Sequence, residues 1–207
     1  MDKINVGQKA GAQLVHANDL DALAEMGAMA LLNPRGHFKV EHWRGGKRID
    51  ERQFPNGIVN EGKNLLLNTM FNGGTAIGTW YLGLIDNAGY TALASDDIYD
   101  DINQAGNGWD EFDDYTDPGN ADSAVTRPAW TEGAASGQAI TNSSTVNFDI
   151  NASGTVKGVF LCGGTNAQTK NDHAPTVNTL WATALFSGGD VVVTNGDQLK
   201  VTYTVSA

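Results

Sequence analysis

Alternating hydrophobic and polar positions mark the segment after residue 35 as β-structure. Phe38, Val40 and His42 fall on one face of an extended chain. Lys39, Glu41 and Trp43 fall on the other face. A Gly45-Gly46 pair then precedes a second alternating run, KRIDERQF. Because two-residue glycine turns connect the strands of hairpins, this pattern predicts a charged, exposed two-stranded β-ribbon over residues 35–56.

The second half of the chain has the pattern of a β-sandwich. From Arg127 onward, short β-type runs alternate with Gly, Ser, Asn and Thr, and regularly spaced strands with small polar turns are typical of sandwiches. The runs are RPAW, TVNFDI, GTVKGVFLCG, LWATALFSG, DVVV and QLKVTYTVS, and an earlier strand, TWYLGLID, is expected at 79–86.

Helical spacing is confined to short segments. Apolar residues recur at helical intervals between Asp19 and Asn33, where Asn33-Pro34 ends the helix. A second helix is expected over 60–71, ended by Gly73-Gly74, and a helical fragment is expected near 95–104.

These elements predict a mainly β protein with a β-sandwich-like domain and short helices. We expect an N-terminal arm and helix at 1–34, the β-ribbon at 35–56, and the sandwich domain at 57–207 with an acidic loop at 95–122.

Charge is distributed unevenly along the 207 residues, whose formal net charge is −11. Between Lys63 and Arg127 there is no Lys or Arg, although this interval holds 11 of the 24 acidic residues. Residues 35–63 are mildly basic instead. An acidic protein of this kind would approach phosphates against its own field, so we expect no binding to nucleic acid.

The stretch WDEFDDYTDPGNAD, residues 109–122, is a candidate calcium-binding loop because it is rich in carboxylates. The best local start, Asp101, lacks the fifth ligand of an EF-hand and places Phe112 where the last carboxylate belongs. We therefore assign no metal ligands and interpret 95–122 as a solvent-facing acidic loop anchored by Trp109, Phe112 and Tyr115. An irregular calcium site within 96–122 stays an alternative.

Signatures of catalysis are absent from the sequence. It contains no G-x-S-x-G, no Walker-type glycine loop and no H-E-x-x-H. Cys162 lies in an apolar strand context, where a lone thiol is usually a small buried hydrophobe. Crowded carboxylates at 96–122 can be paired in many ways and indicate no particular site. We predict a non-enzymatic structural or binding protein without a cofactor.

Aromatic residues leave one binding alternative open. Trp80, Tyr81, Trp109, Tyr115 and Trp130 either belong to the core or form a platform for sugars, as in a carbohydrate-binding module.

Targeting signals are also missing. The first residues lack the order of a secretory signal, and the apolar run at 23–32 is too short to cross a bilayer. Together with the single cysteine, Cys162, these features predict synthesis in the cytosol and no membrane association.

The order of segments resembles a known group of proteins. A ribbon FKVEHWRGGKRIDERQFPN leads into GIVNEGKNLLLNTMFNGG, then TWYLGLIDN, WDEFDDY, a segment beginning RPAW, and LWATALFSGGDVVVTNGDQLKVTYTVSA. This order is similar to that of capsid decoration (cement) and related minor virion structural proteins of tailed bacteriophages. The resemblance covers residues 36–207, and this chain has extra acidic length before WDEFDDY.

The resemblance implies a decoration protein on the capsid surface of the virion. Such a protein would bind the major capsid protein shell between capsomers, as a homotrimer, and residues 1–34 would order on the shell or on a neighbour. A tail or head-to-tail component is the alternative within the virion. The expected contact residues are Phe38, Trp43, Arg44, Lys47, Arg48 and Arg52. The ribbon packing on its own domain is the competing hypothesis for these residues.

Overall fold

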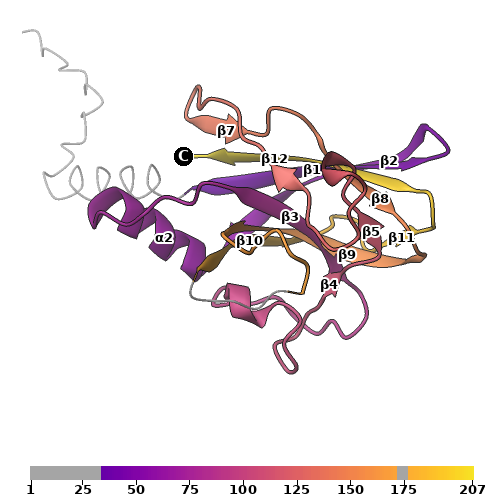
Figure 1. Ribbon diagram of the computed structural model, residues 1–207, viewed down its shortest axis with the longest axis horizontal. Coiled ribbons are helices and arrows are strands. Elements are labelled where there is room, and N and C mark those ends of the chain that lie inside the picture. Colours follow the sequence, from indigo (N-terminus) through magenta and orange to yellow (C-terminus); the bar gives the residue numbers. More distant parts are fainter. Residues whose placement is uncertain (1–33, 172–176) are drawn as a thin grey trace, which may run out of the picture. The chain divides into compact units, whose positions relative to one another are not determined.

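Strands dominate the described part of the chain, as the alternating pattern predicts, and the fold is mainly β. The computed structural model describes residues 34–171 and 177–207 (Figure 1). The arm and helix expected at 1–34 therefore lie outside the described residues, apart from Pro34.

The strands follow one another with few helical interruptions. Their bounds are β1 Arg35–Arg44, β2 Lys47–Ile58, β3 Trp80–Asp86, β4 Glu111–Phe112, β5 Tyr115–Thr116, β6 Ala129–Trp130, β7 Ala139–Thr141, β8 Val146–Ile150, β9 Gly154–Gly164, β10 Asn178–Leu185, β11 Val191–Val193 and β12 Gln198–Ser206. The helices are α2 Asn60–Phe71 and the single-turn 3-10 helices η1 Tyr99–Asp101 and η2 Pro118–Asn120.

The strands hydrogen-bond in the order β4-β3-β9-β10-β2-β1-β12-β8-β5, and all the pairings are antiparallel. β2 belongs to both layers of the sandwich-like arrangement, because its main part pairs with β1 while its end, Gly57–Ile58, pairs with β10. One long strand thus connects the layer of β1, β12 and β8 to the layer of β10, β9 and β3 (Figure 1).

The main core lies between these two layers. Phe38 and Val40 of β1 face inward together with Leu82 and Leu84 of β3. Aromatic rings stack through this core, with the ring centroids of Phe38 and Tyr203 4.3 Å apart.

A second core covers the other face of β9. This strand is buried on both faces, which explains its continuous apolar run GVFLCGG. The residues packed there come largely from the acidic part of the chain and from β9 and β10, and they are Val59, Ile85, Tyr99, Ile102, Trp109, Phe160, Cys162, Ala167 and Leu180.

The predicted hairpin is present and is part of the sheet. Gly45 and Gly46 both have positive φ, 56° and 75°, which a type I′ turn requires and which glycine adopts without strain. On its other side β1 pairs with β12 from Arg35↔Ser206 to Trp43↔Gln198. The hairpin is therefore no free ribbon, and it lies with the sandwich in one compact unit, Pro34–Ser206.

Helix α2 has the bounds that the sequence predicts and ends at the expected glycines. Gly73 has a positive φ of 65°, and the Gly74 amide donates to the carbonyl of Asn68. One side of the helix packs on β10, where Gly62 leaves room for the backbone of Trp181. No helix in the described ranges is long and apolar enough to cross a membrane.

Close packing of β9 against β10 is testable at Gly158. A Cβ there would lie 2.1 Å from the carbonyl oxygen of Ala184, whereas a Cβ at Gly57 would meet nothing within 4 Å. Gly158→Ala should lower the free energy of unfolding by about 1–3 kcal/mol, because a backbone atom must move. Denaturant unfolding of Gly158→Ala and of the strand control Gly57→Ala measures this. Equal stabilities of the two variants would contradict the packing described.

Candidate functional site

The hairpin ends in an irregular tip, which we define as Trp43–Ile49. Trp43 pairs with Arg48, but His42 pairs with Asp50, so Ile49 is the extra residue of a β-bulge. The Ile49 side chain is 52% exposed. The bulge thus presents an apolar side chain to solvent, and Figure 1 shows this tip at the opposite end of the view from α2.

Trp43 is held in a fixed orientation at the base of the tip. The Nζ atom of Lys200 lies 4.4 Å from the Trp43 ring centroid, and the indole Nε1 donates to Glu41 over 2.9 Å. A lysine over the ring is a favourable cation–π arrangement. The half-buried ring therefore has one face in contact with this cation.

Phe38 does not lie on the surface that the sequence assigned to it. Its side chain is fully buried against Tyr203 and Phe54. The reason is that β1 is a central strand, so the face carrying Phe38 looks into the core. Phe38 holds the hairpin in place and cannot contact a partner in the folded protein.

Arg44 is engaged by a buried carboxylate of the β11–β12 turn. Its Nε and Nη2 donate to the two oxygens of Asp197, each over 2.7 Å. Asp197 is 1% exposed and also accepts from His42 Nε2 at 2.8 Å and from the Thr194 amide at 2.9 Å. The hydrogen bonds from Arg44, followed by those from Thr194 and His42, hold the pKa of Asp197 well below its usual range.

The other expected contact bases lie on the exposed edge of the hairpin and are mostly ion-paired. Arg48 pairs with Glu51, and Arg52 donates to Asp50 over 2.7 Å. Lys47 is exposed and forms no ion pair within the described residues. The hairpin surface is therefore a mixed-charge surface around Ile49, and the mild basic excess of the sequence does not produce an open basic patch.

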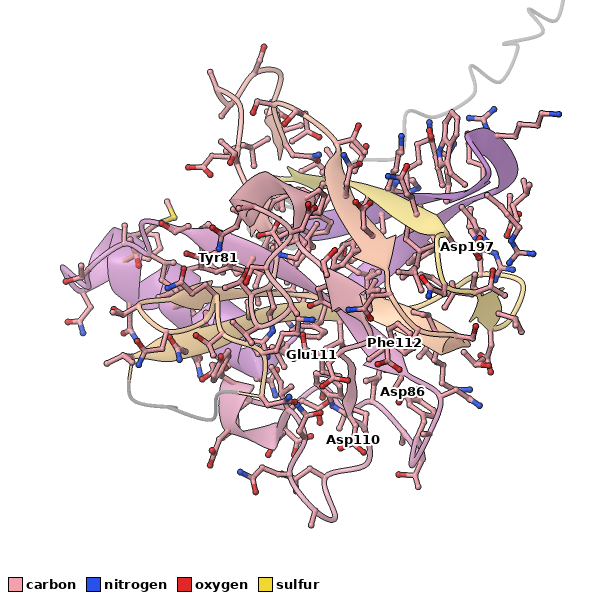
Figure 2. The ribbon with its side chains drawn as sticks, turned by 45° about the vertical axis from the view of Figure 1, so that its right-hand side comes forward. Tyr81, Asp86, Asp110, Glu111, Phe112 and Asp197 are labelled. Carbon is pink, nitrogen blue, oxygen red and sulfur yellow. The ribbon has the colours of Figure 1, made fainter. Side chains whose placement is uncertain are left out.

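The acidic segment contains a buried ion pair, which the sequence did not indicate. Arg127 Nε and Nη2 donate to the two carboxylate oxygens of Glu111 over 2.9 and 2.7 Å, and both side chains have no exposed surface. Arg127 Nη1 donates to the Tyr99 hydroxyl over 2.9 Å, and the Tyr115 hydroxyl donates to Glu111 over 3.0 Å. Figure 2 shows Glu111 within the body of the molecule.

Other members of this segment are also packed. Trp109 Nε1 donates to Asp97 over 3.0 Å, and burial raises the pKa of Asp97. Lys170 Nζ donates to the carbonyls of Asp113 and Tyr115 over 2.7 and 2.6 Å. The expected aromatic anchors Trp109, Phe112 and Tyr115 are indeed buried. The interpretation of 95–122 as a solvated acidic loop is wrong for three of its carboxylates, which are buried as well: Asp97, Glu111 and Asp117.

No arrangement typical of catalysis appears where the structure describes the chain. Burial raises the pKa of the Cys162 thiol to about 12, so this thiol stays protonated and is a poor nucleophile at neutral pH. Within residues 34–171 and 177–207, no three His, Cys, Asp or Glu side chains come together closely enough to hold a metal ion.

The aromatic platform considered for sugars is not formed by the residues proposed for it. Trp109, Trp130 and Tyr115 are buried, and Trp80 packs edge-on against Trp181. A polar cavity of about 460 Å³ lies beside η2, but its one aromatic lining residue is Tyr81. A carbohydrate-binding role would have to use amide and hydroxyl groups with little stacking.

Sequence reasoning missed three features of these sites, namely Ile49, Asp197 and the Glu111–Arg127 pair. One of them, the Glu111–Arg127 pair, had a usable signal. Glu111 lies between two buried aromatic residues, Trp109 and Phe112, and Arg127 is the first basic residue after a long acidic interval. The bulge at Ile49 had no signal in the sequence.

Comparison with protein families, with curated proteins and with solved structures finds no match to this chain.

The buried pair can be tested by removing one charge. Arg127→Met leaves Glu111 buried without its partner and should lower the free energy of unfolding by about 3–5 kcal/mol. The double variant Glu111→Leu/Arg127→Met should recover much of this loss, because no charge is then left unpaired. Arg48→Met, at an exposed ion pair, should cost at most about 1 kcal/mol. Urea unfolding measures all three, and a small effect of Arg127→Met would contradict the role described.

Asp197 makes stability depend on pH. Because its folded pKa is depressed, the carboxylate stabilises the fold above the unfolded pKa of about 3.9, and this stabilisation is lost as the pH falls towards the folded pKa. Asp197→Asn should cost about 2 kcal/mol at pH 7 and progressively less below about pH 4. Unfolding curves at several pH values measure this, with Asp190→Asn as the exposed control. A difference that does not narrow in acid would contradict the assignment.

Proposed function

We propose that this chain is a non-enzymatic structural protein of a tailed-phage virion. In this proposal it is a capsid decoration protein that binds the major capsid protein shell between capsomers as a homotrimer. The resemblance in segment order over residues 36–207 supports the class of protein. The internal pairing of the reactive side chains and the exposed hairpin tip support a role in binding rather than in catalysis.

One observation carries the proposal. Side chains that could act as catalytic acids, bases or nucleophiles are instead buried or hydrogen-bonded within the protein, where they stabilise the fold. Glu111 and Arg127 satisfy each other inside the protein, Asp197 is saturated by hydrogen bonds, and Cys162 is buried. A catalytic group must reach a substrate, and these four side chains have their polar atoms directed to partners within the molecule.

The hairpin tip has the composition of a contact surface. Exposed Ile49 belongs to the same short tip as exposed Lys47 and Arg48 and the half-buried Trp43, so the tip combines apolar and charged side chains. The tip is also rigid at its base, because β1 is hydrogen-bonded on both sides. A preordered surface loses little entropy when it binds.

The charge of the chain suits a protein present in many copies. A net charge of −11 keeps free copies apart in solution. On a repetitive shell, several weak contacts from one oligomer add through effective concentration. High affinity then requires only a modest contact surface on each copy.

The test is a binding experiment on phage heads that lack this protein. Purified full-length chain is added, and bound copies are counted by quantitative mass spectrometry against the major capsid protein. We expect a copy number in simple proportion to the capsid protein. Ile49→Asp should weaken binding roughly tenfold or more, since it places a charge at the apolar centre of the contact. Val125→Asp introduces the same charge at a position that is 65% exposed in another loop and should bind as the wild type does.

Each possible outcome tests a different part of the proposal. A copy number equal to that of a single ring would assign the protein to the tail or the head-to-tail junction. No binding to heads, together with absence from complete virions, would contradict a virion role. Normal occupancy by Ile49→Asp would remove the hairpin tip as the contact surface.

A further inference from the structure

Helix α2 exposes a row of large apolar side chains. Leu67, Met70 and Phe71 are 51%, 59% and 68% exposed. Their spacing of three and four residues places them on one face of the helix. The opposite side, which includes Gly62 and Leu66, packs on the protein. The helix thus has a second apolar face, which we call the α2 surface, directed to solvent.

The α2 surface also lies in the least charged part of a strongly charged protein, and its one exposed charge within α2 is Lys63, one helical turn before Leu67. Residues 64–85 contain no Asp, Glu, Lys, Arg or His, whereas the chain as a whole has a net charge of −11. Two copies that approach through other faces bring like charges together. Two copies that approach through α2 bring only one lysine each, Lys63, and none of the acidic residues of the central interval, so the charge distribution favours this face for self-association.

We propose that the α2 surface is where copies of this chain contact one another, with α2 of one copy against α2 of a second. Around a two-fold or three-fold axis, Leu67, Met70 and Phe71 of each copy are then buried against those of its neighbours. The hairpin tip stays free in such an assembly, because Figure 1 shows it on the side of the unit Pro34–Ser206 that is opposite to α2. The inference does not depend on the identity of the partner bound by the tip.

The oligomeric state of the full-length chain tests the inference. Light scattering and sedimentation should give an oligomer for the wild type at micromolar concentrations. Phe71→Asp should weaken the association roughly 30-fold or more, since it charges a central apolar contact. Val192→Asp, at another valine that is 66% exposed, should leave the mass unchanged. Both variants should retain the wild-type circular dichroism spectrum, because both positions are exposed in the single copy.

A cross-link identifies the contact directly. Met70→Cys adds an accessible thiol, and Cys162 does not compete because it is buried. Mild oxidation should yield a disulfide-linked dimer that reductant separates, whereas Val192→Cys should yield little. A monomeric wild type would mean that something other than a second copy covers this surface and would overturn the inference. An oligomer that neither Phe71→Asp weakens nor Met70→Cys cross-links would overturn it as well.

Discussion

The buried ion pair between Glu111 and Arg127 is the contact on which the packing of the acidic middle of the chain depends. Each charge would be costly to bury alone, and each has its partner and further hydrogen bonds to tyrosine hydroxyls or a backbone carbonyl. Because Glu111 begins β4, the pair ties this strand to Arg127 and to the loop after β9. An interval with a large excess of negative charge can therefore cover one face of the sheet.

Much of the fold was predictable because its signals are local. Alternation identified the long strands, and the glycine pairs identified the hairpin turn and the end of α2 within a residue or two. β4, β5 and β7 were missed, since strands of two or three residues leave no period to detect. Phe38 was assigned to a surface because nothing in the sequence shows that β12 pairs with β1 far along the chain.

The candidate sites were less predictable, because their charges are neutralised over long sequence distances. Arg44 and Asp197 are 153 residues apart, and the partner of Glu111 lies 16 residues away across a loop. Counting charges along the sequence indicated a basic ribbon and a solvated acidic loop. In the structure many of these charges are paired, and the exposed apolar residues Ile49 and Phe71 stand out instead.

The position of β2 has a mechanical consequence. This strand begins at the hairpin turn, passes through both layers of the sheet and continues directly into α2. A force applied at the hairpin along the strands would load the hydrogen bonds of β1 with β2 and of β1 with β12 in shear, so that many bonds must break together. Tension between the hairpin tip and α2 would pass through the backbone of a single strand, β2. The sandwich is therefore built to resist extension along the line that joins its two exposed apolar surfaces.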